Sequence, residues 1–337
     1  MTLSILIPTY DFVCYPLVLA LHGQAEALGI DYEILVAEDG SKQQDRVVAN
    51  LKINELPHCR HLRRTENAGR AAIRNILADE ARGEWLLFLD SDAKVEKPDF
   101  LAAYLAAANA ESPEPHDAQE EPDSQQEKPR DEQEKPHDTQ AERATARRSN
   151  APVIVGGLYH AAACADPTRA LRFRYEHEAD KSRGAAQRSL KPYMEFSMFN
   201  SMIRSDIFRA LRFDEQCREY GYEDVLFGLA LQRRGIPILH IDNALLHTGL
   251  DTNVQFLGKT EAALRTLAAL APELRECSRV HRLFARLKRY ALALLLRAAF
   301  RLCGKPLRRH LEKSARPSLR LFALYKLLYY ASLRPAT

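Results

Sequence analysis

The chain has 337 residues, 46% of them hydrophobic and 28% charged, which is typical of a soluble globular protein with one large domain or two smaller ones. Its formal net charge of +3 hides an uneven distribution, because residues 111–149 carry a net charge of −6 and residues 259–337 a net charge of +14. From the pattern of apolar, basic and cysteine residues we expect no signal peptide, no bilayer-spanning segment of about 20 residues, no CxxC metal motif and no disulfide framework.

Residues 1–110 alternate short apolar runs with stretches of helical periodicity. The expected strands are Leu3 to Ile7, Glu33 to Ala37, Cys59 to Arg64 and residues 84–92. The expected helices are Pro16 to Ala27, residues 42–54 and Asn67 to Ala81. Strands and helices that alternate in this way indicate a mainly parallel sheet with helices on both faces.

Polar loops follow three of these expected strands. They are Thr9–Tyr10–Asp11, Glu38–Asp39–Gly40 and Asp90–Ser91–Asp92. Ligands of open α/β sheets bind beyond the carboxyl ends of the strands, where such loops meet. We therefore expect the three loops to line one pocket.

Residues 111–150 interrupt the alternation. The segment is rich in Pro, Glu, Gln and Asp, and the only hydrophobic residues of 111–149 are alanines. It cannot bury enough apolar surface to offset the conformational entropy that folding would cost. A near-repeat, EKPRD followed by EKPHD, is typical of low-complexity expansion. We expect a disordered acidic insertion that contributes no catalytic group.

An ordered pattern resumes after the insertion and leads into a basic C-terminal region. Met198 to Leu211 and Glu223 to Arg234 have helical periodicity, and residues 236–249 indicate a strand followed by a turn. From Lys259 onward the pattern is helical and rich in Leu and Arg. Interruptions of these helices are predicted at Gly304, Pro306 and Pro317.

The motif Asp90–Ser91–Asp92 directly follows a buried apolar run. Two carboxylates in a cleft repel each other unless a cation joins them. A hard divalent cation with oxygen ligands fits such a pair and can carry the phosphates of a nucleotide. The alternative is a solvated Asp-Ser-Asp turn, and the triplet alone does not decide between the two.

The sequence resembles glycosyltransferase family 2, whose members have the GT-A fold, in five successive blocks. The blocks are SILIPTYDF, VAEDGS, NAGRAAIRN, GEWLLFLDSDA and GYEDVLFGLALQRRG. The resemblance implies an α/β, Rossmann-like fold with a mainly parallel central sheet flanked by helices. Residues 1–110 would bind the nucleotide sugar and residues 151–258 the acceptor, with the insertion at 111–150 and a helical extension at 259–337. Glu38, where many members have Asp, is a mild departure.

The resemblance also implies a donor site. Thr9 and Tyr10 would line the pocket for the nucleotide base, and Asp39 would contact the base or the ribose. Two arginines would approach the base or the diphosphate from the helix that follows the NAG motif. The implied donor-binding residues are Thr9, Tyr10, Asp39, Asn67, Arg70, Arg74 and Asp90.

A divalent cation, Mn²⁺ or Mg²⁺, is the implied cofactor. Asp90 and Asp92 would hold it on the donor diphosphate, where it would offset the charge of the leaving nucleoside diphosphate. A late histidine completes the metal site in several GT-A enzymes, and His247, after an apolar strand, is the expected ligand. His240 is the competitor, which we expect to lie within the strand instead.

On the acceptor side, the resemblance implies Glu223 and Asp224, which lie at the start of an expected helix. An inverting transfer needs a carboxylate that takes the proton of the acceptor hydroxyl as its oxygen attacks the anomeric carbon. In the family the Asp of this pair is the usual base, so Asp224 is the expected base. Glu223 would contact the acceptor or support the loop. The alternative is that both acids merely stabilise the helix N-terminus through its dipole.

The basic region at 259–337 mixes Leu, Phe and Tyr with Arg and Lys at helical spacing. Such helices can lie on an anionic membrane surface. The alternative is a helical pair packed on the core with a solvated basic face. Because no nucleic-acid motif accompanies the charge, we expect peripheral membrane contact and no nucleic-acid partner.

These features predict an inverting, metal-dependent hexosyl- or N-acetylhexosaminyltransferase at the inner face of the cytoplasmic membrane. The donor would be a nucleoside-diphosphate sugar, UDP being the commonest carrier in the family, and the acceptor a glycan or lipid-linked glycan of bacterial surface-polysaccharide or lipopolysaccharide synthesis. A nucleotidyltransferase would need a glycine-rich loop where this chain has PTYDF. A catalytically inactive nucleotide- or carbohydrate-binding scaffold remains as an alternative, which the intact Asp39, Asp90, Asp92 and Asp224 oppose.

Overall fold

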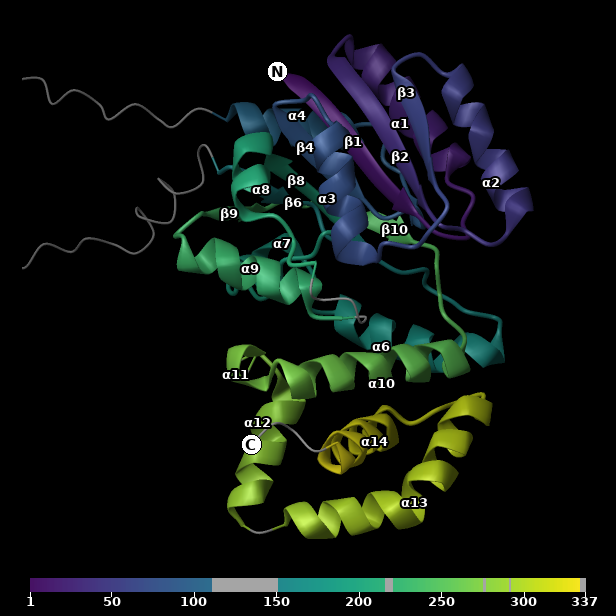
Figure 1. Cartoon of the computed structure of the whole chain (residues 1–337), viewed down its shortest axis with the longest axis vertical. Helices are drawn as coiled ribbons and strands as arrows, with labels where there is room; N and C mark the ends of the chain where they lie inside the picture. Colours follow the sequence, from purple (N-terminus) through teal and green to yellow (C-terminus); the bar gives the residue numbers. More distant parts are fainter. Residues whose placement is uncertain (111–150, 216–220, 275–276, 291, 334–337) are drawn as a thin grey trace, which may run out of the picture.

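The computed structural model of this chain describes residues 1–110, 151–215, 221–274, 277–290 and 292–333. The predicted acidic insertion at 111–150 lies outside these residues. The described part has a sheet domain that contains the N-terminus and, beneath it in Figure 1, a layer of C-terminal helices.

A seven-stranded sheet forms the centre of the sheet domain, in the order β3-β2-β1-β4-β8-β6-β9. The strands are β1 (Thr2–Thr9), β2 (Asp31–Asp39), β3 (Cys59–Arg64), β4 (Trp85–Leu89), β6 (Val153–Val155), β8 (Asn200–Arg204) and β9 (Ile238–His240). Strands β3, β2, β1 and β4 are parallel, whereas β8 is antiparallel to both of its neighbours. The predicted mainly parallel α/β sheet is confirmed, with one strand reversed.

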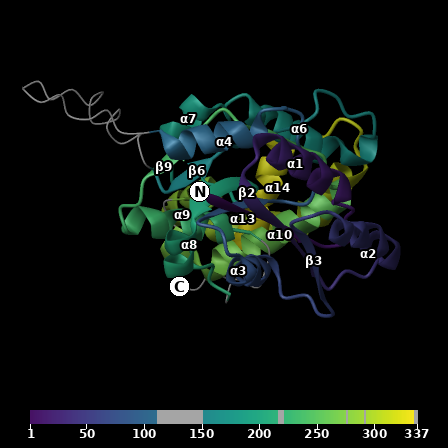
Figure 2. The ribbon, with the colours of Figure 1, turned by 90° about the horizontal axis from the view of Figure 1, so that it is seen from above.

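Helices cover both faces of this sheet because the inner strands are apolar on both sides. In β1, Leu3, Ile5 and Ile7 pack with α1 and α4, and Leu6, pointing the opposite way, packs with α3, α8 and α9. Figure 2 shows these two groups of helices on opposite sides of the strands. The helices are α1 (Tyr15–Leu28), α2 (Gln44–Asn50), α3 (Arg70–Glu80), α4 (Phe100–Asn109), α6 (Ala170–Asp180), α7 (Ala185–Ser189), α8 (Ser205–Leu211) and α9 (Glu223–Arg233).

A second, three-stranded sheet lies at the carboxyl end of β4. It consists of β5 (Ala93–Lys94), β10 (Leu245–His247) and β7 (Leu158–Tyr159), with β10 in the middle. His247 of β10 lies opposite Ala93 of β5 in an antiparallel pair. This pairing brings a histidine that is more than 150 positions away to the end of the Asp90–Ser91–Asp92 loop.

The predicted helix from Met198 to Leu211 is wrong over its first part. Asn200–Arg204 form β8, which lies between β4 and β6, and only Ser205–Leu211 are helical. Residues 200–204 meet two strands that have free edges, and their backbone groups gain partners from both sides. Tertiary pairing therefore overrides the local helical pattern.

The C-terminal layer is helical, as the basic extension predicted. Its helices are α10 (Asn253–Ala269), α11 (Ala271–Leu274), α12 (Arg279–Arg289), α13 (Ala293–Lys313) and α14 (Leu319–Ser332). In Figure 1, α14 lies among α10, α12 and α13, and its buried Phe322, Tyr325 and Tyr330 belong to the two cores of this layer. Helix α10 begins six residues before the predicted start of the extension at Lys259.

Two of the three predicted helix interruptions are wrong. The chain breaks around Pro317, between α13 and α14, but α13 continues through Gly304 and Pro306. A proline inside a helix removes one backbone hydrogen bond, and packing of α13 on α14 through Phe300 and Leu307 offsets that loss. Within the described residues, no helix combines the length and apolarity that crossing a bilayer requires.

Candidate active site

A cavity of about 250 Å³ lies beyond the carboxyl ends of β1, β2 and β4. All three polar loops that the sequence pointed to contribute to its wall, which confirms their convergence. The lining residues are Pro8, Thr9, Tyr10, Phe12, Asp39, Arg70, Ile73, Arg74, Asp90, Ser91, Asp92 and Lys259. Lys259 comes from α10, so the C-terminal layer contributes a side chain to this cavity.

Asp39 and Asn67 organise the wall on the side of β2. The Asp39 carboxylate accepts the backbone N–H groups of Ala68 (2.7 Å) and Gly69 (3.1 Å), just before α3, and the Asn67 amide donates to the Asp39 carbonyl (2.8 Å). Burial raises the pKa of Asp39 even though these two N–H groups lower it. Gly40, with φ of +70°, allows this approach, because a Cβ there would lie 2.5 Å from the Asn67 nitrogen.

Thr9 ends β1, next to β2 in the sheet, and Tyr10 follows it. Thr9 is buried and its hydroxyl donates to the Phe12 carbonyl (3.2 Å), whereas Tyr10, which also lines the cavity, is 44% exposed. A planar, exposed aromatic side chain beside a polar pocket suits stacking with a nucleotide base. Their role in base binding remains a prediction.

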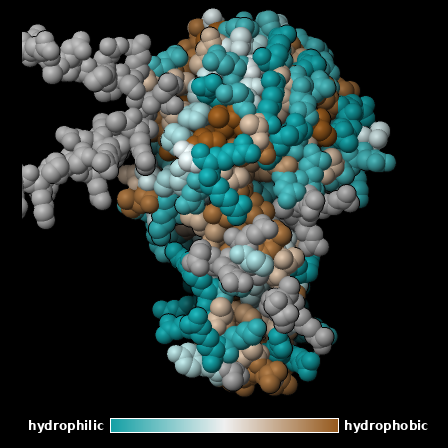
Figure 3. All heavy atoms as spheres, turned by 60° about the vertical axis from the view of Figure 1, so that its left-hand side comes forward, coloured by the Kyte–Doolittle hydropathy of each residue, from teal (hydrophilic) through white to brown (hydrophobic). Residues whose placement is uncertain are grey.

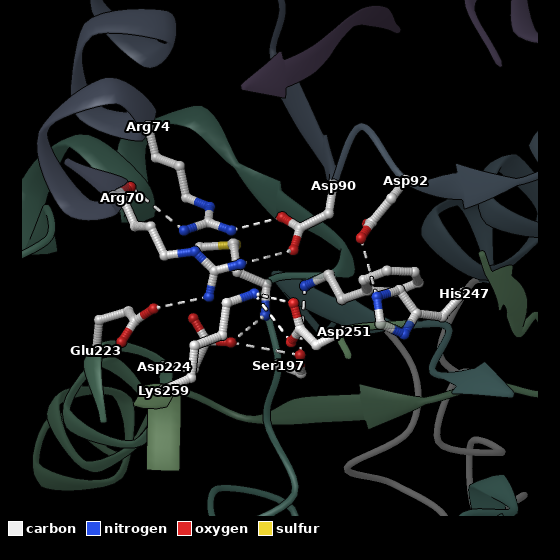
Figure 4. A network of polar contacts seen from close by, with 12 residues as sticks. Arg70, Arg74, Asp90, Asp92, Ser197, Glu223, Asp224, His247, Asp251 and Lys259 are labelled. Carbon is white, nitrogen blue, oxygen red and sulfur yellow. Dashed lines mark hydrogen bonds and ion pairs between the residues drawn. The ribbon is translucent and has the colours of Figure 1, made fainter. Parts of the chain in front are cut away.

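Asp90 faces two arginines of α3 (Figure 4). Arg74 Nη2 lies 2.6 Å from Asp90 Oδ1, and Arg70 Nη2 lies 3.5 Å from Asp90 Oδ2. Burial would raise the pKa of Asp90, but Arg74 and Arg70 outweigh it and hold that pKa below its ordinary value. Arg70 also contacts Glu223 Oε1 at 3.3 Å, which connects the donor-side loop to α9.

The Asp92 side chain ends at His247, whereas Asp90 points to the two arginines (Figure 4). Asp92 Oδ2 lies 3.0 Å from His247 Nε2. The two carboxylates of the motif therefore have different partners, although the sequence predicted that they share one ion. Among the described residues, no three carboxylate, imidazole or thiol side chains converge as a metal site.

Asp92 and His247 nevertheless fit part of a site for Mn²⁺ or Mg²⁺. Asp92 Oδ2 and His247 Nε2 lie 3.0 Å apart, so one small cation would be within reach of both atoms. A carboxylate oxygen and an imidazole nitrogen suit Mn²⁺. Such ions commonly keep waters and substrate phosphates as their other ligands, so two protein ligands are sufficient.

Asp224 lies in the first turn of α9, across the site from Asp90. Its Oδ2 accepts the backbone N–H of Met198 (3.0 Å) and the Ser197 hydroxyl (3.3 Å). Its Oδ1 is buried and, within the part of the chain that the structure describes, has no hydrogen-bond partner. Burial raises the pKa of Asp224 to about 6, with Arg74 lowering it and Glu223 raising it.

Glu223 is buried beside Asp224 and pairs with Arg70. The α9 N-cap residue, Tyr222, makes no side-chain capping bond, and the recorded partners of both acids are groups outside α9. Hydrogen-bonded capping of the helix therefore does not account for this acidic pair.

The two candidate histidine ligands, His240 and His247, have different surroundings. His240 ends β9, accepts from Arg188 at Nδ1 (2.9 Å) and donates from Nε2 to the Pro192 carbonyl (3.0 Å). Burial lowers the pKa of His240 to about 4, which is expected of a neutral structural imidazole. His247 reaches the site, as the sequence predicted.

Sequence reasoning missed three residues at or behind the site. They are Lys259 in the cavity wall, Ser197 beside Asp224 and His160, whose Nε2 lies 2.9 Å from His247 Nδ1. Local sequence gives no signal for them, since each reaches the site only through pairing of distant segments.

Comparison with known proteins gives a match to one family. The profile described as Glycosyl transferase family 2 matches residues 4–209, which contain every donor-side residue predicted above. A search of curated proteins by sequence finds no match.

Solved structures also align with this chain. The mannosyltransferase PcManGT from Pyrobaculum calidifontis, solved with GDP-Man and Mn²⁺, has a TM-score of 0.50 at 12% identity, over 98% of this chain and 85% of that chain. TarS 1–349 from S. aureus with UDP-GlcNAc has a TM-score of 0.45 at 14% identity, over 98% and 90%. Mannosyl-3-phosphoglycerate synthase from Rubrobacter xylanophilus has 0.47 at 12% identity, over 82% and 75%.

Proposed function

The chain belongs to glycosyl transferase family 2, and we propose that it is an inverting, metal-dependent glycosyltransferase with Asp224 as its general base. The observation that carries the proposal is the buried Asp224 Oδ1, which has no partner among the described residues, in a carboxylate whose pKa is about 6. A base with a pKa near the working pH is mostly ionised and still accepts a proton readily.

In this mechanism the acceptor hydroxyl binds at Asp224 Oδ1. The hydroxyl oxygen attacks the anomeric carbon while Oδ1 takes its proton, and the bond to the nucleoside diphosphate breaks on the opposite side. One displacement inverts the anomeric configuration. The Met198 N–H and the Ser197 hydroxyl hold the other carboxylate oxygen, so that Oδ1 keeps its direction.

The donor in this proposal is a nucleoside-diphosphate sugar, with UDP favoured as the commonest carrier in the family. Two arginines of the cavity wall, Arg70 and Arg74, support it, because their charge suits a diphosphate. Asp92 and His247 would hold Mn²⁺ or Mg²⁺, which offsets the charge of the leaving diphosphate when bound. The structural relatives solved with GDP-Man and Mn²⁺ and with UDP-GlcNAc make both nucleotides worth testing.

Nucleotide release from UDP-, GDP- and dTDP-sugars tests this proposal. It is measured with Mn²⁺, with Mg²⁺ and with EDTA, for the wild type and for Asp92→Ala. We expect slow hydrolysis of one donor that is lost with EDTA and in the variant. Metal-dependent nucleotide binding without hydrolysis, even with candidate acceptors, would support an inactive binding protein instead.

We further propose that the acceptor is a lipid-linked or surface glycan, and that α13 lies on an anionic membrane. Figure 3 shows apolar side chains gathered at the end of the molecule that holds α13. A groove of about 630 Å³ between α13 and α14 is lined almost entirely by apolar side chains. Large apolar residues on and around α13 and α14 also remain exposed. They are Tyr290, Leu292, Leu294, Leu295, Leu302 and Leu324.

Basic side chains accompany this apolar surface. Arg301, Lys305 and Arg309 are exposed and spaced four residues apart, so they form one row along α13. Leu294 and Leu302 are 73% and 77% exposed, which packing of the helix against its own core does not explain. Exposed apolar side chains next to a row of basic side chains are typical of a helix that lies at a membrane interface.

Flotation with vesicles that contain anionic lipid tests the membrane contact. The triple variant Leu294→Ser, Leu295→Ser, Leu302→Ser is expected to bind the vesicles at least tenfold more weakly. Three leucine side chains that leave water for the membrane contribute several kcal/mol to binding. Leu19→Ser, an exposed leucine of α1 in the sheet domain, is the matched control and should float like the wild type. Equal flotation of all three proteins would contradict the contact.

A further inference from the structure

Four side chains form a continuous line of polar contacts behind the cavity. Asp92 Oδ2 lies 3.0 Å from His247 Nε2, His247 Nδ1 lies 2.9 Å from His160 Nε2, and His160 Nδ1 lies 3.0 Å from Asp180 Oδ2. Of these four residues, Asp92 and His247 are the expected metal ligands. His160 and Asp180 have no part in the mechanism described above.

The three-stranded sheet sets this line in place. In the parallel pair of β10 and β7, Leu246 lies opposite Tyr159, so His247 and His160 occupy the next row side by side. Their rings meet edge to face, with centroids 5.0 Å apart and planes at 83°. This geometry points a nitrogen of one ring at a nitrogen of the other.

Asp180, at the end of α6, is fixed independently of His247. It accepts the backbone N–H of His160 (3.0 Å) and a guanidinium N–H of Arg183 (2.8 Å). Arg183 also pairs with Glu176 at 2.8 Å. Since a carboxylate ion can only accept hydrogen bonds, Asp180 requires a proton on Nδ1 of the buried His160 ring.

The next proton along the line is that of the His247 ring. His160 meets His247 through its other nitrogen, Nε2, and His247 Nδ1 is the atom opposite it. A cation held by His247 Nε2 would need the lone pair of that nitrogen, so the proton of the His247 ring would be on Nδ1. From Nδ1 the proton can be donated to His160 Nε2, and the line of contacts matches this arrangement.

We propose that His160 and Asp180 are positioning residues that fix the tautomer and ring orientation of His247, so that its Nε2 is presented to a divalent cation. This inference rests on the proposed function, because it takes Asp92 and His247 as metal ligands. Histidine ligands of metals usually donate their other N–H to a carboxylate or a carbonyl. Here a second histidine stands between the ligand and the carboxylate.

Affinity for Mn²⁺ tests the inference without relying on turnover. The signal of free aqueous Mn²⁺ in electron paramagnetic resonance gives the Kd for the full chain, with UDP or GDP present. His160→Ala is expected to raise that Kd about 10- to 100-fold, the usual cost of losing a partner of a metal-binding histidine. His160→Gln should restore most of the affinity, because the Gln amide oxygen can accept from His247 Nδ1.

Two further measurements separate positioning from general structural damage. Tyr159→Phe, the neighbouring residue whose hydroxyl contacts exposed Glu96, should keep the wild-type Kd. In the metal-free protein, imidazole ¹⁵N shifts should show His247 protonated at Nδ1, with a mixture of tautomers in His160→Ala. If His160→Ala does not fold, Asp180→Asn replaces it, since its amide can also donate to His160 and release the tautomer.

The outcomes distinguish this inference from the proposed metal site. If Asp92→Ala and His247→Ala lose Mn²⁺ but His160→Ala keeps the wild-type Kd, the positioning role is overturned and the metal site stands. The role is also overturned if a folded His160→Gln binds as weakly as His160→Ala. If the wild type does not bind Mn²⁺, or Asp92→Ala leaves the Kd unchanged, both the metal site and the inference are overturned.

Discussion

Asp90 and Asp224 lie in one network of polar contacts (Figure 4) and come from the two halves of the sheet domain, yet their surroundings are opposite. Asp90 lies against Arg74 and Arg70, which hold its pKa below the ordinary value despite burial. Among the described residues, the hydrogen-bond donors to Asp224 are a backbone N–H and a hydroxyl, and burial raises its pKa to about 6. The difference shows that charged partners, and not depth alone, decide whether a buried carboxylate is a fixed anion or a proton acceptor.

The arginines of α3 create this contrast. Arg70 contacts Asp90 and also Glu223, and Arg74 contacts Asp90 and the Arg70 carbonyl. The charge of Arg74 therefore lowers the pKa of Asp224 from a distance, without an ion pair between the two side chains. A matched pair of carboxylates with separated pKa values is how enzymes assign one group to charge and another to proton transfer.

Replacing Asp224 should break the contrast most strongly. Asp224→Asn keeps the size and the N–H contact of the side chain but removes the proton acceptor, so we expect kcat to fall about 10³-fold. The donor Kd, measured by calorimetry, should stay within about threefold, since Asp224 is not among the residues lining the donor cavity. Near-normal turnover by this variant would contradict the assignment of the base.

Replacing Arg74, the positively charged partner of Asp90, should have the next largest effect. Arg74→Gln leaves Asp90 without its closest partner, and loss of one member of a buried ion pair costs about 3 kcal/mol of unfolding free energy. Urea denaturation at pH 7 measures this cost. Arg60→Gln, which removes an exposed pair with Glu80, is the control and should cost less than about 1 kcal/mol. Equal values for the two variants would show that the Asp90 pair is not special.

The pH dependence of kcat/KM should sharpen the contrast. Only ionised Asp224 accepts a proton, so log kcat/KM should rise by one per pH unit up to about 6 and level off above it. Arg74 lowers the pKa of Asp224, so Arg74→Gln should move this midpoint upward. A midpoint that stays at the wild-type value in that variant would mean that Arg74 does not act on the base.

The stability of Asp224→Asn should show the smallest effect. A folded-state pKa above the ordinary carboxyl value means that ionisation destabilises the fold, and stability is lost as pH rises through about 6. The variant should therefore be more stable than the wild type by about 1–2 kcal/mol at pH 7.5. The two proteins should become equal below about pH 4, where the wild-type carboxyl is neutral in both states. Thermal unfolding at the two pH values measures the difference.

Much of the donor side could be predicted from the sequence. Apolar runs that end in Thr9, Asp39 and Asp90 predicted strands and a shared pocket, because the carboxyl ends of parallel strands lie at one edge of the sheet. The fate of residues 200–204 could not be predicted in this way. Their side chains have a helical pattern, and only the open edges of β4 and β6 make them a strand.

The sequence by itself determined which residues are buried and which strand ends carry polar groups, since periodicity encodes burial locally. The tertiary structure alone decided which partner each polar group meets. Asp90 and Asp92 are two positions apart, yet one meets Arg74 of α3 and the other His247 of β10. His160 reaches His247 only because β7 pairs with β10. Partner choice depends on contacts between distant segments, and local sequence does not encode those contacts.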